Sequence, residues 1–144
     1  MSLLQAVHLP GLTIPGNLFM APMAGYTDAA FRALCVEQGA CLCYSEMVSA
    51  EGLVRGGPQS WALLARAGIE SHWAVQLFGS EPRALAAAAR LVGPRGPCLL
   101  DLNCGCSVPK VLKSGAGAAL LRSPKLIGEL VAALRQESGV PVTV

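Results

Sequence analysis

Charged and aromatic residues are scarce in this chain of 144 residues. Asp, Glu, Lys and Arg together make up 14% of it, and Phe, Trp and Tyr only 5%. Because hydrophobic residues reach 53% and the formal net charge is only +2, the composition excludes an intrinsically disordered chain. The small charge also excludes a strongly basic nucleic-acid-binding protein, although it leaves room for a local basic patch. The length suits one domain with a hydrophobic core.

The sequence also lacks an unbroken hydrophobic run long enough to cross a membrane. Residues 1–27 contain no Asp, Glu, Lys or Arg, but prolines and glycines interrupt them repeatedly, so no spanning helix fits. No basic segment precedes this stretch and no Ala-x-Ala site follows it, which argues against a secretory signal. We therefore expect no membrane insertion. The hydrophobic composition favours a parallel sheet that is buried on both faces.

None of the six cysteines belongs to a Cys-x-x-Cys motif, which argues against a zinc ribbon and a thioredoxin-type site. Cysteines without a secretory signal favour a reducing, cytoplasmic compartment. Two Cys-x-Cys pairs, Cys41/Cys43 and Cys104/Cys106, leave a thiol redox or metal protein as an alternative, because residues two apart on a strand share a face. Structural zinc prefers wider cysteine spacing, and the two histidines lack a ligand spacing, so we expect no metal.

Apolar runs typical of strands alternate with helical patterns along the chain. After short extended pieces at 6–20, we expect strands at 18–23, 40–47, 72–79 and 97–105 and the start of a fifth at 140–144; helices are expected from Thr27 to Gly39, at 59–68, from Glu81 to Leu91 and from Pro124 to Ser138. Four such units imply right-handed connections and a parallel sheet. An eight-unit barrel needs about 250 residues, so we predict an α/β fold corresponding to the first half of a (β/α) TIM-type barrel.

Polar and glycine-rich groups follow the predicted strands, where such barrels carry their chemistry. Gln76 lies in an apolar run, so its amide is either a satisfied core group or a ligand for a polar ring edge. Cys106 is either a small buried residue or a general acid, since a thiol with a pKa of about 8.5 is mostly protonated at neutral pH. The residues alone leave both alternatives open.

Five segments, taken in their order, resemble the tRNA-dihydrouridine synthases. They are "MAPMAGYTDAAFRALCVEQGA" (20–40), "SEMVSAEGL" (45–53), "VQLFGSEP" (75–82), "DLNCGC" with "PKV" (101–111) and "GAGAALLRSPKLIGELVAAL" (115–134). The resemblance covers about residues 12–144. It implies that residues 1–144 form the N-terminal portion of an FMN-binding barrel domain, without the C-terminal barrel half and the helical tRNA-binding domain. The implied reaction reduces uridine in tRNA to 5,6-dihydrouridine with FMN and with NADPH or NADH.

The resemblance also implies roles for single residues. Pro22, Met23 and Ala24 correspond to the loop that packs on the flavin ring, and Gln76 corresponds to a glutamine that hydrogen-bonds the flavin. Taken alone, the short Ala-Pro-Met sequence reads equally well as a turn after a strand. Glu46, at the end of a predicted strand, is expected to be an exposed carboxylate rather than part of the site.

On the substrate side, Cys106 corresponds to the catalytic cysteine, which would protonate carbon 5 of uracil while hydride from reduced FMN reaches carbon 6. Asn103 would line the uracil pocket. Lys110 would face the RNA, although a solvated loop lysine is the alternative.

Two departures from the family pattern stand out. Ser107 follows the cysteine where the family has proline, and the next proline is Pro109, so the restraint on the thiol is expected to be looser. The flavin-binding lysine of the family would lie just beyond Val144. A non-catalytic remnant or interaction module of the same fold is therefore an alternative, and a flavin oxidoreductase acting on a free pyrimidine is another.

Overall fold

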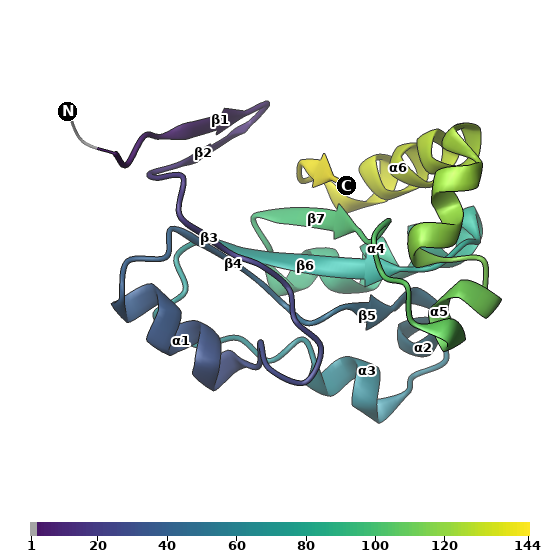
Figure 1. The fold of residues 1–144 in the computed structure, drawn as a ribbon, viewed down its shortest axis with the longest axis horizontal. Helices are drawn as coiled ribbons and strands as arrows, with labels where there is room; N and C mark the ends of the chain where they lie inside the picture. The colour runs from purple at the N-terminus through teal and green to yellow at the C-terminus, as the bar shows by residue number, and fades with distance from the viewer. Residues whose placement is uncertain (1–2) are drawn as a thin grey trace.

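The main sheet has its strands in the same order in space as along the chain. The computed structural model describes residues 3–144. The parallel strands are β3 (Phe19–Met20), β4 (Leu42–Tyr44), β6 (Trp73–Phe78), β7 (Leu99–Leu102) and β8 (Val142–Thr143), and β5 (Val48–Ser49) extends the sheet beside the end of β6 (Figure 1). A doubly wound sheet would reverse its strand order partway. The sequential order therefore confirms the predicted α/β fold of barrel type, as an arc that does not close within these residues.

Helices alternate with these strands as predicted. They are α1 (Ala29–Glu37), α2 (Ala50–Val54), α3 (Pro58–Ala62), α4 (Pro82–Val92), α5 (Pro109–Lys113) and α6 (Pro124–Ser138), with the 3₁₀ turns η1 (Gly93–Arg95) and η2 (Gly117–Arg122). The bounds of α6 match the prediction, because proline opens the helix and Gly139, at φ 66°, ends it. None of the helices in residues 3–144 combines the length and the hydrophobicity that crossing a membrane requires.

Three local predictions were wrong in detail. The helix expected to start at Thr27 starts at Ala29, because Asp28 caps α1 by accepting a hydrogen bond from the backbone N–H of Phe31, while the buried Thr27 hydroxyl is hydrogen-bonded to the backbone of Met23. The run 40–47 is not one strand, because β4 ends at Tyr44 and the chain leaves the sheet before β5. The helix expected at 59–68 shrinks to α3, after which Leu64 turns into the core. Helices α2 and α5 are too short to produce a periodic pattern.

One face of the sheet packs against helices. Alternate residues of the central strands, such as Trp73, Val75 and Leu77 on β6 and Leu100 and Leu102 on β7, belong to a buried cluster with side chains of α2, α4 and α6. Figure 1 shows α4 and α6 beside these strands. This is the helix-covered outer face of a (β/α) barrel.

The other face changes character along the strands. Near their amino ends Leu42, Ala74 and Leu99 form a second buried cluster, together with Ile14 and neighbouring residues of an antiparallel hairpin, β1 (Val7–Leu9) and β2 (Leu12–Ile14). The hairpin turns at Gly11, whose φ of +79° favours glycine. It lies beyond the strand starts, whereas the arrowheads of β6 and β7 point toward α5 (Figure 1). Toward those arrowheads the same face becomes polar.

Candidate active site

Three polar side chains form a row across the inner face near the carboxyl ends of the strands. Gln76 on β6 is paired in register with Asp101 on β7, which is paired with Thr143 on β8. The Asp101 carboxylate lies between its neighbours: Gln76 Nε2 donates to Oδ2 at 2.7 Å, and the Thr143 hydroxyl donates to Oδ1. Gln76 and Asp101 are only 7% and 8% exposed, so each depends on these partners for hydrogen bonding.

The row continues into the loop that carries Cys106. Asn103 Nδ2 donates to Gln76 Oε1 at 2.9 Å. Asn103 Oδ1 in turn accepts from the backbone N–H groups of Cys106, at 3.0 Å, and Gly105, at 3.3 Å. We call the chain of side chains Asp101–Gln76–Asn103 the amide relay. It connects a buried carboxylate to the backbone of the cysteine loop.

The peptide group on the carboxyl side of Cys106 is hydrogen-bonded by a different segment of the chain. Its carbonyl oxygen accepts from the backbone N–H of Ala118 in η2, at 2.9 Å. Gly117 packs so closely beneath the loop that an added Cβ would lie 2.5 Å from the Cys106 oxygen and 2.9 Å from Val111 Cγ1. The glycine-rich segment after α5 therefore packs against the Cys106 loop. The backbone of Cys106, whose thiol is half-buried, is hydrogen-bonded at both its N–H and its carbonyl oxygen.

The two thiols of the Cys-x-Cys pair differ in environment. Cys104 packs against the hydrophobic cluster of the outer face, and burial, reinforced by the charge of Asp101, raises the pKa of its thiol. Cys106 lies in the same loop beyond the end of β7 and is also half-buried, but it is not among the residues that pack against this cluster. This difference supports Cys106, rather than Cys104, as the thiol that can meet a ligand.

The loop after β3 is tied to the same edge. A carboxylate oxygen of Glu46 accepts from the backbone N–H of Gly25, and the adjacent Ser45 hydroxyl accepts from the backbone N–H of Gln76. Met23, 42% exposed, and the exposed Ala24 lie between this anchor and the half-buried Pro22. The expectation of an exposed Glu46 was therefore wrong, because the side chain is half-buried and anchors the loop.

A buried ion pair is hydrogen-bonded to the end of this loop. Arg32 on α1 and Glu70 are 1% exposed each, and their Nε and Oε1 atoms are 2.7 Å apart. Arg32 also donates to the carbonyl oxygens of Thr27 and Ala65, both at 2.7 Å. The pair thus links the end of the loop after β3 to the segment between α3 and β6.

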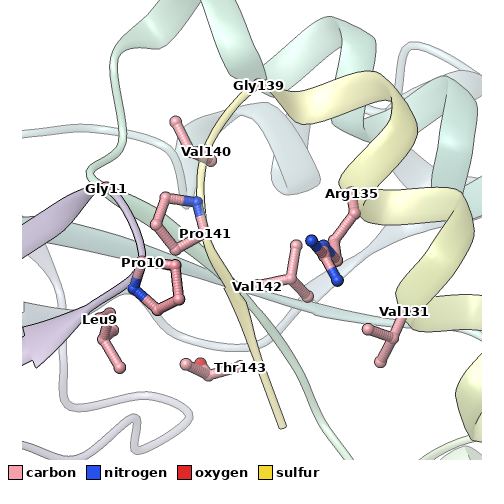
Figure 2. Close-up of a pocket in the computed structure, with 10 residues that line it drawn as sticks. All are labelled: Leu9, Pro10, Gly11, Val131, Arg135, Gly139, Val140, Pro141, Val142 and Thr143. Atoms are coloured by element: carbon pink, nitrogen blue, oxygen red, sulfur yellow. The ribbon is translucent and has the colours of Figure 1, made fainter.

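Two cavities lie along the main sheet. One, of about 420 Å³, opens where β5, β6 and the loop after β7 end, and its lining includes Met47, Phe78 and the exposed Lys110. The other, of about 440 Å³, lies between the turn of the hairpin and β8, with Arg135 of α6 on one side (Figure 2). Thr143 is the one residue of the polar row that lines the second cavity. Of the site residues predicted from the sequence, all of which the structure describes, Lys110 lines the first cavity and none lines the cavity of Figure 2. Lys110 therefore lies apart from Gln76, Asn103 and Cys106, which the polar row and its extension bring together.

The six cysteines are free. Across residues 3–144, no three or more His, Cys, Asp and Glu side chains come together as a metal site would require.

Sequence reasoning missed Asp101, Thr143 and Gly117 as parts of the site and misjudged Glu46. Asp101 carried a usable signal, because a carboxylate within the run Leu99–Leu102 must find partners in a buried sheet. Gly117 carried none, since its contact with the Cys106 loop depends on tertiary structure.

Comparison with known proteins adds independent findings. A family model described as dihydrouridine synthase (Dus) matches residues 19–144. A probable tRNA-dihydrouridine synthase of Treponema pallidum is 43% identical over 99% of this chain, which covers 44% of that relative. The tRNA-dihydrouridine synthase B of Shewanella oneidensis is 38% identical over 90% of the chain, which covers 40% of it. A probable tRNA-dihydrouridine synthase of Aquifex aeolicus is 42% identical over 81%, with 37% covered. The chain spans less than half the length of these curated relatives.

Proposed function

The chain belongs to the dihydrouridine synthase family, and on that premise we propose that the protein reduces uridine in tRNA to 5,6-dihydrouridine. The observation that carries the proposal is the placement of Cys106. Its backbone is hydrogen-bonded on both sides, at the carboxyl edge of a parallel sheet, next to Gln76 and Asn103. Residues 1–144 then supply the N-terminal portion of an FMN-binding barrel domain. The rest of the barrel and a helical tRNA-binding domain would lie outside this sequence.

The residues at this edge suit a flavin. Within the relay Gln76 uses one N–H and one lone pair, so its amide retains one donor and one acceptor for the polar edge of a ring. Met23, exposed and apolar, offers a contact for a ring face on a loop whose backbone Glu46 anchors. Pro22, Met23, Ala24 and Gln76 would hold the cofactor. Reduced FMN, regenerated by NADPH or NADH, would supply a hydride for carbon 6 of uracil.

Cys106 would complete the reduction by general acid catalysis. Its S–H bond breaks as a C–H bond forms at carbon 5 of the base, and the resulting thiolate recovers a proton from water. Asn103 fixes the loop through its carbonyl oxygen and would line the uracil pocket, while its Nδ2 donates to Gln76 Oε1 and to Met47 Sδ, at 4.0 Å. Lys110, exposed in α5, would contact the RNA backbone as a cation. The partner is tRNA, and the setting is the cytoplasm.

The test uses full-length, flavin-loaded protein and tRNA that lacks dihydrouridine. Dihydrouridine formation is quantified by mass spectrometry with NADPH or NADH as reductant. Cys106→Ala should lower kcat by about 10²–10⁴-fold, the usual contribution of a general acid. The matched control is Cys104→Ala, which removes a neighbouring thiol and should leave kcat unchanged. A flavin-loaded wild-type protein that leaves tRNA unreduced would refute the function, and an active Cys106→Ala variant would refute the role of the thiol.

A further inference from the structure

Strand β7 carries one carboxylate, and its three remaining residues are leucines. Asp101 is 8% exposed and lies in register between Gln76 and Thr143. Both of its oxygens accept hydrogen bonds, one from each neighbouring strand. A buried carboxylate is unfavourable unless it is paired in this way, so its place in the middle of an apolar strand calls for an explanation.

The explanation lies in the direction of the hydrogen bonds. A carboxylate can only accept, so Gln76 must turn its NH₂ group toward Asp101 and its oxygen toward Asn103. Asn103 must then turn its own NH₂ group toward Gln76. This leaves the Asn103 oxygen facing the loop, where it accepts from the N–H groups of Gly105 and Cys106.

Each amide has one donor end and one acceptor end, so the orientation chosen at Asp101 is passed along the relay. If both amides were reversed, Asn103 would present its NH₂ group to the N–H of Cys106, and two donors would face each other. The loop would lose its anchor on the amino side of Cys106 and would keep only the contacts of the Cys106 carbonyl with Ala118 and Gly117.

We propose that Asp101 is a positioning residue that orients the amide relay and thereby fixes the backbone of Cys106. The proposal rests on the proposed function for the role of Cys106 as proton donor. The part played by Asp101 is that of an obligatory acceptor, and its negative charge is not required. This distinction separates the relay from a general electrostatic effect of Asp101 on the site.

Two substitutions separate the acceptor from the charge. Asp101→Leu removes the acceptor and lets the Gln76 amide rotate. Asp101→Asn keeps an oxygen for Gln76 and can donate its NH₂ group to the Thr143 hydroxyl, which also accepts. In the full-length, flavin-loaded enzyme, Asp101→Leu should lower kcat about 10²-fold, the effect of a misplacement of about 1 Å, with KM for tRNA unchanged. Asp101→Asn should remain close to wild type.

A second readout follows Cys106 directly and does not need turnover. The rate at which iodoacetamide alkylates Cys106, measured by peptide mass spectrometry, should rise in Asp101→Leu and stay unchanged in Asp101→Asn. Glu129→Gln, which removes an exposed carboxylate on α6, is the charge control and should match wild type. If Asp101→Leu fails to fold, Asp101→Ser replaces it, because its shorter side chain also withdraws the acceptor from Gln76.

The outcomes are decisive in either direction. Equal losses in Asp101→Asn and Asp101→Leu would overturn the relay in favour of a charge effect. Wild-type kcat and alkylation in Asp101→Leu would remove any positioning role. If wild-type enzyme itself leaves tRNA unreduced, the proposed function fails, while the alkylation rates of the same variants still test the relay.

Discussion

Gly117 offers a direct way to displace Cys106 without touching its side chain. In Gly117→Ala the new Cβ would lie 2.5 Å from the Cys106 carbonyl oxygen. Ordinary van der Waals contact begins at 3.4 Å, so the two atoms must move apart by about 0.9 Å. Because Val111 Cγ1 lies 2.9 Å away on another side, the alanine cannot retreat freely, and the cysteine loop must yield.

The size of the effect follows from this displacement. A shift of about 1 Å in a catalytic group lowers the rate by about 10²-fold, so we expect a loss of that order in kcat. The φ of +62° adds a separate effect on stability of about 1–2 kcal/mol, because alanine adopts the left-handed region unfavourably. Both quantities can be measured on one preparation, by dihydrouridine formation and by urea unfolding.

Gly115→Ala is the matched control. Gly115 has a similar φ of +75°, but a Cβ there would meet only Ser80, at an ordinary 3.5 Å. Both variants should therefore lose similar stability from the backbone, and only Gly117→Ala should lose about 10²-fold in kcat. Equal kcat values in the two variants would refute the view that the glycine-rich segment positions Cys106.

Three further predictions concern the surrounding structure. Glu46→Ala should weaken FMN binding about tenfold or more in a flavin titration, because the backbone N–H of Gly25 loses a charged acceptor. Glu46→Gln should lose less affinity for FMN. An FMN affinity of Glu46→Ala equal to that of the wild type would contradict the anchoring role. Glu70→Ala should lower the free energy of unfolding by about 3–5 kcal/mol, because Arg32 would remain buried and unpaired, and urea unfolding with little change would contradict this. Burial raises the pKa of Cys43 from 9.0 to about 11, so the thiol loses its proton at lower pH in the unfolded chain than in the folded protein. The free energy of unfolding should therefore fall as pH rises from 9 to 11. An equal fall in Cys43→Ala would show that Cys43 is not its cause.

The strand–helix alternation could be predicted because its signals are local. Apolar runs and helix-opening prolines identified β6, α4 and α6 nearly to the residue, whereas β7 (Leu99–Leu102) is shorter than the strand expected at 97–105. The short elements α2 and α5 escaped prediction, because five residues give no periodicity. The run 40–47 was misread as one strand although Ser45 and Glu46 interrupt its hydrophobic residues; backbone pairing with β6 stops after Tyr44, and β5 resumes it.

The site was predictable as a set of residues but not as a network. The rule that chemistry gathers at the carboxyl ends of parallel strands brought Gln76, Asn103 and Cys106 to one edge. Which atoms pair depends on register between strands far apart in sequence, and no local pattern encodes it. Asp101 illustrates this limit, because only its register with Gln76 and Thr143 brings its carboxylate within hydrogen-bonding distance of both side chains.

Ser107 stands directly after Cys106, where the family pattern has proline. A proline at that position would restrain the cysteine through covalent geometry, and Ser107 provides no such restraint. The structure holds Cys106 by other means: Asn103 binds its N–H, Ala118 binds its carbonyl oxygen, and Gly117 packs against that oxygen. Hydrogen bonds of this kind fix a backbone only if their partners are themselves fixed. Placement of the thiol therefore depends on the amide relay on one side and on η2 on the other, which explains why substitutions outside the loop are expected to alter its chemistry.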